Sequence, residues 1–176
     1  RKNRQMELLK HMSPSSMKKI ARRYLPWIGL FIFLYTVGML IPEGFDWRVY
    51  FSKGLVHPVW TPWTKTILRI LSWPLVVAIT LMSLIVRTNR FTRTPLPMAL
   101  AILSLPTIWV LFMGNLDGLV LAGLLFLPWG VPLVLMKPQL AAFSLFAKRS
   151  YIIAGIAWIL ISFIIWGFWP NNFLMV

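Results

Sequence analysis

Residues 25–51, LPWIGLFIFLYTVGMLIPEGFDWRVYF, are the stretch that decides the fold. Their first part, 25–41, is an apolar run that would cover roughly 26 Å as a helix, near the lower limit for crossing a bilayer core. Their second part brings Glu43 and Asp46 to the boundary of the membrane. A carboxylate beside lipid costs free energy unless it is hydrated, paired or used in chemistry. Asp46 is therefore the leading candidate for a catalytic residue.

The composition of the whole chain indicates a polytopic integral membrane protein. Hydrophobic residues make up 59% of it and charged residues only 12%, whereas about a quarter of the residues in a soluble domain are charged. Since lipid offers no partner to an open strand edge, and no barrel-like alternation is present, we expect an all-α fold. The chain has no cysteine, which excludes disulfides and cysteine-based metal or catalytic sites.

The apolar runs predict about five transmembrane helices. A basic cytoplasmic or interfacial segment, residues 1–24, with a short surface helix at Met17–Tyr24, would precede a helical domain at 25–176. An extracytoplasmic loop of short, broken helices would cover 42–66. The expected spans are about 25–41, 67–86, 97–113, 119–136 and 151–169.

The distribution of basic residues sets the expected orientation. If the N-terminus is cytoplasmic, fourteen of the 18 Lys and Arg residues fall on the cytoplasmic side, Lys137 among them. The opposite side then holds four cations together with Asp46 and Asp117. This asymmetry follows the positive-inside rule, so we expect a multi-pass protein of a prokaryotic cytoplasmic (inner) membrane. The cations are dispersed in short turns and one tail, which favours anionic lipid and argues against nucleic acid as a partner.

Asp46 has three polar neighbours in sequence: Arg48, Tyr50 and Lys53. In a helix, positions 46, 50 and 53 share one face. A carboxylate near cations and a phenol could act as a general base on a hydroxyl group, while the cations stabilise a phosphate leaving group. Alternatively, Asp46 pairs with Arg48 or caps a short helix in an interfacial loop.

A second polar segment is the turn at 114–118, Gly-Asn-Leu-Asp-Gly. Its composition is typical of a turn in which glycine accepts positive φ and Asn or Asp caps the next helix. In a functional interpretation, Asn115 and Asp117 lie on the wet face near Asp46. Lys137, after the next apolar run, either ends that helix with its ammonium group reaching water or holds a lipid phosphate.

Metal and cofactor sites find little support in the sequence. His11 and His57 are far apart and lie on opposite expected sides, so they do not form a metal site. His57 could ligate the iron of a haem, or a chlorin, through one imidazole nitrogen, or it could be structural within its proline-rich loop. The ten tryptophans fit interfacial belts and interhelical packing better than a binding box. We expect no cofactor and no metal.

The order of these motifs resembles the N-terminal half of the GT-C membrane glycosyltransferases, above all the polyprenol-phosphate-mannose-dependent type (glycosyltransferase family 87). The similarity covers roughly residues 25–145. It is carried by the segments at 46–51, DWRVYF, and 61–63, TPW, and then by 114–120, GNLDGLV, before a helix that ends in 137–139, KPQ. Family members have about twice as many spans, and Trp47 replaces their usual phenylalanine.

The resemblance implies an inverting sugar transfer at the extracytoplasmic face of the membrane. Asp46 would be the general base on the acceptor hydroxyl, and Arg48 and Tyr50 would flank the donor phosphate. Asn115 would line the pocket where the family has glutamine or asparagine. The chain would then be a module of such an enzyme, active or degenerate.

The alternative function is that of a non-catalytic accessory subunit within a larger membrane complex of respiratory or photosynthetic type. It is favoured by the short chain, the many aromatic residues and the poverty of ionisable groups inside the spans. Other membrane subunits would then be the partners in place of a polyprenyl-phosphate sugar. Proton and ion pathways need ionisable groups inside the spans, so a transporter is the third interpretation, after the other two.

Overall fold

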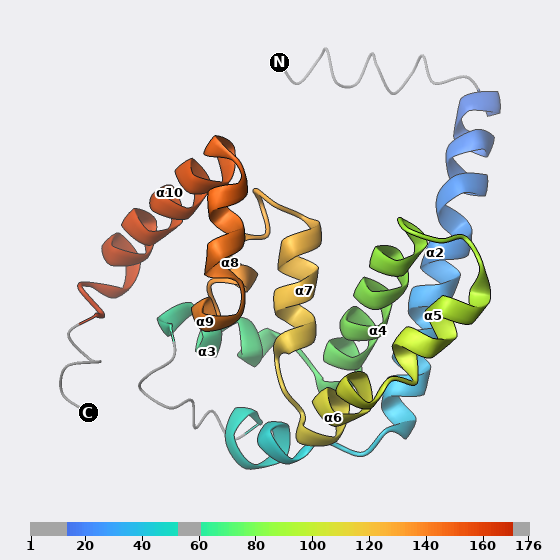
Figure 1. Cartoon of the computed structure of the whole chain (residues 1–176), viewed down its shortest axis with the longest axis horizontal. Coiled ribbons are helices and arrows are strands. Elements are labelled where there is room, and N and C mark those ends of the chain that lie inside the picture. The colour runs from blue at the N-terminus through green and yellow to red at the C-terminus, as the bar shows by residue number, and fades with distance from the viewer. Residues whose placement is uncertain (1–13, 53–60, 171–176) are drawn as a thin grey trace. The chain divides into compact units, whose positions relative to one another are not determined.

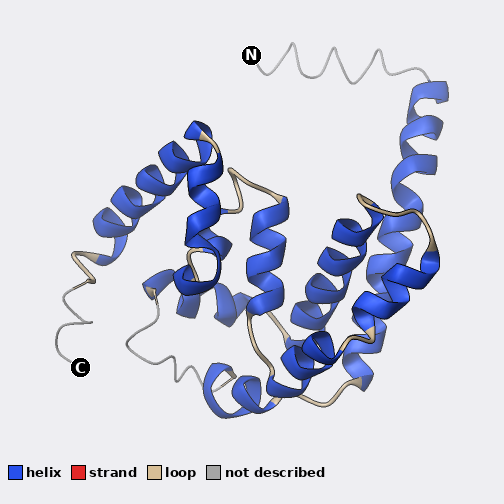
Figure 2. Ribbon diagram, in the orientation of Figure 1, coloured by secondary structure: helices blue, strands red, loops and turns tan. Residues whose placement is uncertain are grey.

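The computed structural model describes residues 14–52 and 61–170. The described residues form helices joined by turns and loops, without a strand (Figure 2). The chain divides into two compact units, Arg1–Phe33 and Leu34–Val176. In the first unit the described residues belong to a single helix, and the candidate site lies wholly in the second. An all-α fold is therefore confirmed for the described residues.

The helices follow one another closely along the chain (Figure 1). In order they are α2 (Pro14–Leu40), η1 (Trp47–Phe51), α3 (Pro62–Ile70), α4 (Trp73–Asn89), α5 (Pro95–Ile102), α6 (Leu105–Met113), α7 (Asp117–Leu125), α8 (Val131–Val134), α9 (Pro138–Ala141), η2 (Ala142–Ala147) and α10 (Arg149–Trp166). Among the described helices, two are long and apolar enough to cross a membrane, at Ala21–Leu40 and Arg149–Trp166. The number rises to four if each of two bent helix pairs counts as one span.

The first expected span is longer than its apolar run. α2 continues through Pro26 from Pro14 to Leu40, so the prediction of a separate surface helix at Met17–Tyr24 is wrong. Lys, Arg and Ala residues at 18–23 have high helix propensity and extend the helix backwards. Proline inside a helix removes one backbone hydrogen bond and strains the preceding turn, yet here the helix continues on both sides of Pro26.

The second expected span begins later than the sequence suggests. α3 and α4 are separate helices, bent by 103° at a break between Ile70 and Trp73. Pro74 lies in the first turn of α4, where its missing N–H costs nothing, and it is not the kink expected inside a span. α4 packs at the centre of the second unit, and Val77 and Ala78 are fully buried.

The third expected span is likewise a bent pair. α5 and α6 meet at an angle of 43°, and Pro106 lies in the first turn of α6. The Ala101 carbonyl accepts hydrogen bonds from Ser104 Oγ at 2.9 Å and from Thr107 Oγ1 at 2.8 Å. These hydroxyl groups satisfy a carbonyl that the break would otherwise leave unpaired, as an apolar environment requires.

The fourth expected span, 119–136, does not form one continuous helix. α7 ends at Leu125, turns follow at 126–130, and α8 packs back against α7. The two helices approach so closely that a Cβ built on Gly123 would lie 2.7 Å from the Gly130 carbonyl oxygen. Pro128, Gly130 and Pro132 interrupt the run within five positions, which explains the reversal in physical terms.

Three contacts hold the second unit together around this hairpin. A Cβ on Gly118 of α7 would overlap the side chain of Thr80 on α4, so this close contact between the two helices requires glycine. Trp63 of α3 is 2% exposed and donates from Nε1 to the Pro132 carbonyl at 2.9 Å. Its ring also packs edge-on against Trp158 of α10 at 5.6 Å. These contacts support the prediction that tryptophans serve interhelical packing.

Candidate functional site

Two loops meet backbone to backbone at Gly44 and Gly114. A Cβ on Gly114 would lie 2.9 Å from Trp47 N, and one on Gly44 would lie 2.7 Å from the Leu111 carbonyl oxygen. Gly114 also has φ of +70°, a conformation that glycine accepts without strain. The sequence-based prediction of a positive-φ glycine in this turn is therefore confirmed at Gly114. The contact brings the segment that carries Asp46 against the turn that carries Asn115 and Asp117.

The segment with Asp46 is anchored by its aromatic neighbours. Asp46 directly precedes η1, a single π-helical turn whose Trp47 and Phe51 are 4% and 7% exposed. The Trp47 ring lies 5.8 Å from that of Trp73, and Trp73 donates from Nε1 to the Ile41 carbonyl at 3.1 Å. Short π-helical segments are rare and are often found at functional sites. Here the buried rings fix the backbone that presents Asp46.

Asp46 itself is half-buried, and neither structural alternative for it is found. It makes no ion pair with Arg48, since the Lys137–Asp117 pair is the ion pair that the structure records among the described residues. It also makes no side-chain capping hydrogen bond to η1. A carboxylate held at a fixed backbone position without these partners is free to accept a proton or a hydrogen bond.

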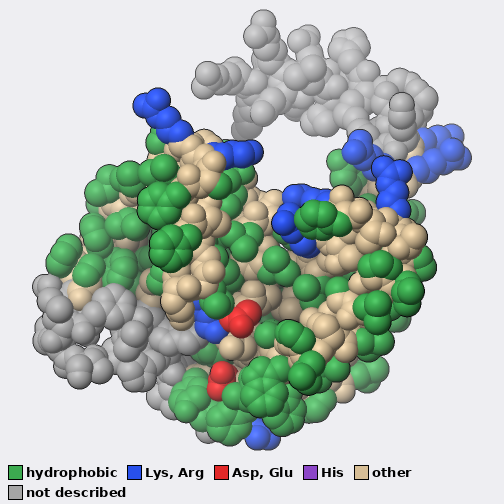
Figure 3. Space-filling view, viewed as in Figure 1, with side chains coloured by type: hydrophobic (Ala, Val, Ile, Leu, Met, Phe, Trp, Pro, Cys, Tyr) green, Lys and Arg blue, Asp and Glu red, His purple; other side chains and the backbone are tan. Residues whose placement is uncertain are grey.

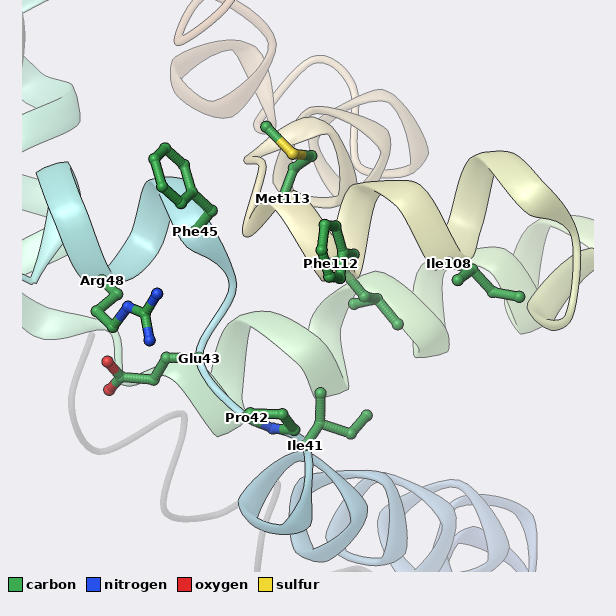
Figure 4. Close-up of a pocket in the computed structure, with 9 residues that line it drawn as sticks. Ile41, Pro42, Glu43, Phe45, Arg48, Ile108, Phe112 and Met113 are labelled. Carbon is green, nitrogen blue, oxygen red and sulfur yellow. The ribbon is translucent and has the colours of Figure 1, made fainter.

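A groove of about 730 Å³ lies beside this segment. Its wall is mostly apolar, and the 41–48 segment and α6 supply it. In Figure 4 the guanidinium of Arg48 and the carboxylate of Glu43 point toward one another, while Phe45 and Phe112 line the groove further along. The groove thus combines one cation and one anion with an apolar surface. Its size is in the range of small-molecule sites.

The other residues predicted around Asp46 are less enclosed. Tyr50 is 46% exposed and is not among the residues that line the groove. Lys53 and His57 lie outside the described residues. Of the four residues expected at the first site, the structure therefore places Asp46 and Arg48 on one anchored segment and Tyr50 on its exposed side.

The second predicted site is a cluster of three polar side chains. Lys137 Nζ lies 2.6 Å from Asp117 Oδ1 and also donates to Asn115 Oδ1. Asn115 Oδ1 accepts a further bond from its neighbour's backbone N–H, Leu116 N, at 2.9 Å. The Lys137 side chain is 11% exposed and that of Asp117 is 33% exposed. Asp117 lies in the first turn of α7, where the helix dipole also favours a negative charge.

This cluster corrects two expectations. Neither Asn115 nor Asp117 caps α7 with its side chain; Asn115 turns to Lys137 and to the adjacent amide. Lys137 was expected on the face of the membrane opposite Asp117, but the ion pair joins them directly. Lys137 was not among the residues predicted for the site. The helix breakers at 128–132 are the sequence signal that indicates a return of the chain toward Asp117.

Few other charged groups approach these residues. On the face shown in Figure 3, the visible acidic side chains are few, one of them touches a blue side chain, and apolar side chains dominate around them. Within residues 14–52 and 61–170 no three His, Asp or Glu side chains are grouped so that they could hold a metal ion. Proton transfer at the first site would rest on Asp46, with Arg48 as the nearby cation, while Lys137 is engaged by Asp117 and Asn115.

The chain was compared with protein families, curated proteins and solved structures. No protein-family model matches the chain, and neither a curated protein nor a solved structure matches it. The functional conclusion therefore rests on this chain's own residues and on their geometry.

Proposed function

We propose that this protein is a GT-C-like membrane module that transfers a sugar from a polyprenyl-phosphate donor at the extracytoplasmic face. The observation that carries the proposal is the contact of Gly44 with Gly114. It unites the two motifs on which the family resemblance depends, the segment of Asp46 and the turn of Asn115. These motifs are about 70 positions apart in the sequence.

In the proposed reaction Asp46 acts as the general base. Its carboxylate takes the proton of the acceptor hydroxyl, whose oxygen forms a bond to the anomeric carbon of the sugar. The bond between that carbon and the phosphate oxygen breaks, and polyprenyl phosphate leaves with the electron pair. The configuration at the anomeric carbon inverts because the acceptor attacks from the opposite side. Proton transfer of this kind contributes about 10²–10⁴-fold to a rate.

The groove beside the segment of Asp46 suits a lipid-linked donor, with Asp46 itself next to the lining residue Phe45 in sequence but not in the wall. Its apolar wall of Phe45, Ile108 and Phe112 matches an isoprenoid chain, and Arg48 supplies a cation for a phosphate. Guanidinium groups bind phosphate oxygens in a bidentate geometry. Tyr50 and Lys53 flank the same segment in sequence and remain proposed as further contacts of the donor.

The proposed topology keeps the N-terminus in the cytoplasm of a prokaryote and the site on the opposite face of its inner membrane. With Lys137 on the face of Asp117, the basic residues divide into thirteen and five, so the positive-inside asymmetry persists. In Figure 1 the link from α4 to α5 and the start of α10 lie at the upper end of the second unit, and the start of α7 lies toward the lower end. The hairpin of α7 and α8, followed by α9 and η2, would replace the expected fourth span.

Sugar transfer in proteoliposomes tests the proposal. The full chain is reconstituted and supplied with polyprenyl-phosphate mannose and with a panel of lipid and polyol acceptors, and the release of polyprenyl phosphate is measured. Release that depends on protein and acceptor supports the proposal. Release no faster than from protein-free vesicles, across the panel and with a correctly folded chain, counts against it.

A non-catalytic accessory subunit remains the second candidate, and the exposed apolar faces favour it. Trp129 is 88% exposed and Ile164 of α10 is 85% exposed, so a neighbouring subunit could cover either side chain as well as lipid could. Gentle purification distinguishes the two functions. Stoichiometric co-purification with other membrane subunits supports the accessory role, and a monodisperse active monomer excludes it.

A further inference from the structure

A second groove, of about 590 Å³, lies on the other side of the Glu43 segment and has a different character. It is lined by the cations Lys65 and Arg69 of α3 and by the hydroxyl-bearing residues Ser52 and Ser72. Lys65 and Arg69 are four positions apart on one helix, so their side chains share a face. Both residues are exposed, and the structure records no ion pair for either among the described residues.

The charge of this groove is positive. Glu43 also lines it, but in Figure 4 its carboxylate points toward Arg48 on the side of the first groove. Lys65 and Arg69 thus face the second groove without a compensating carboxylate of their own. The Ser52 hydroxyl already donates to the Arg48 carbonyl at 3.0 Å. Two cations without an ion pair among the described residues, beside the Ser72 hydroxyl, form a recognition site for a phosphate group, which offers several acceptor oxygens.

The surroundings of the two cations indicate that the phosphate belongs to a lipid. Trp47, Phe51 and Trp73 form an apolar wall of the same groove. α3 is bent by 103° from α4, and Ile70 at its end is 79% exposed. A helix that places cations next to apolar side chains at such an angle to a candidate span is typical of the membrane interface.

We propose that the groove of Lys65 and Arg69 binds the phosphodiester headgroup of an anionic membrane phospholipid, with its acyl chains along the aromatic wall. This site is separate from the proposed donor groove, and it does not require that the protein be a glycosyltransferase. The lipid would hold α3 at the interface and so support the segment that carries Asp46.

Native mass spectrometry of the full chain tests this proposal, with titration by phosphatidylglycerol. The variant Lys65→Ala/Arg69→Ala should bind the lipid roughly tenfold or more weakly, because each cation near a lipid surface contributes substantially to binding. The matched control is Arg87→Ala/Arg90→Ala, which removes the same charge at the far end of α4. Lys65→Gln/Arg69→Gln, which keeps side-chain length and polarity, provides the measurement if the alanine variant does not fold. Equal affinity in the parent and in the groove variants overturns the proposal, as does an equal loss in the control.

Two further arms identify the source of the phosphate and separate this inference from the proposed activity. Inorganic phosphate at millimolar concentration should leave the bound phosphatidylglycerol in place, and its displacement would overturn the assignment to a lipid. Asp46→Asn should bind phosphatidylglycerol as the parent does. A groove variant that loses the lipid supports the inference even where no sugar transfer is found, and a variant that keeps the lipid overturns it even where transfer is intact.

Discussion

Lys137 Nζ lies 2.6 Å from Asp117 Oδ1, and this ion pair closes the open end of the α7–α8 hairpin. With a side chain that is 11% exposed, Lys137 is largely removed from water and needs the oxygens of Asp117 and Asn115. A buried cation without acceptors is costly, whereas a paired one is tolerated. The ion pair thereby joins the start of α7 to the residue that follows the α7–α8 hairpin, in a segment whose apolar composition is that of a membrane span.

Removing the carboxylate should destabilise this hairpin. Asp117→Ala removes the carboxylate partner of the Lys137 ammonium while the Asn115 contact stays, and we expect a loss of about 1–3 kcal/mol, reduced from the fully buried case because Asp117 is 33% exposed. Asp117→Asn keeps an acceptor oxygen and should cost less. Thermal unfolding in detergent, followed by tryptophan fluorescence, measures both. Arg93→Ala, at an exposed cation, is the control, and an equal effect there would contradict the role of the ion pair.

The contact between the two glycines should not tolerate a methyl group. Gly44→Ala would push a Cβ into the backbone of Gly114, which cannot rotate away as a side chain could, so we expect a loss of about 1–3 kcal/mol together with lower transfer activity. Gly29→Ala is the matched control, because no neighbouring atom lies within 4 Å of its Cβ position and alanine favours the helix. If both variants unfold at the parent's temperature, the loops do not depend on this contact.

Trp63 should be the most sensitive tryptophan in the second unit. Trp63→Ala empties a site in contact with three other tryptophans, Trp158, Trp166 and Trp169, and should cost about 3 kcal/mol or more. Trp63→Phe retains much of the packing but loses the bond to the Pro132 carbonyl, so its loss should be intermediate. Trp109→Ala, at a residue 58% exposed, provides the comparison. A larger effect at Trp109 than at Trp63 would contradict the packing described above.

The hairpin makes a topological prediction that differs from the sequence-based one. The parent has no cysteine, so single cysteines can be placed at the exposed positions Glu43, Arg90 and Gln139 and labelled with a membrane-impermeant maleimide in intact cells. We expect the maleimide to label both the Glu43→Cys variant and the Gln139→Cys variant, because both positions would lie on the outer face. The Arg90→Cys variant, on the opposite face, should remain unlabelled. Labelling of Gln139 together with Arg90 would restore the continuous fourth span and contradict the hairpin.

Much of the fold could be predicted from local patterns. The apolar runs mark the helices, and the composition of the 114–118 turn predicts the positive φ of Gly114, because these features depend on near neighbours. The break before α4 also had a local signal, since Ser72 and Pro74 form a helix start. The long apolar run at 67–86 masks this signal, because hydropathy does not register a break of two residues.

The hairpin and the assembled site could not be predicted in the same way. A hairpin buried among helices and a membrane span have the same apolar composition, so hydropathy does not distinguish a run that crosses from one that returns. The breakers Pro128, Gly130 and Pro132 indicate a local interruption at 119–136, but the bond of Lys137 to Asp117, which fixes the return of the chain, joins residues 20 positions apart. The meeting of Gly44 with Gly114 is of the same kind.

The most direct test of the proposed function is the rate of sugar transfer by Asp46→Asn relative to the parent in matched proteoliposomes. The substitution keeps the shape of the side chain and removes its basicity, so the account predicts a fall of about 10²-fold or more. Glu7→Gln neutralises a carboxylate in the N-terminal segment and should leave the rate unchanged. An Asp46→Asn variant that transfers sugar as fast as the parent would contradict the account.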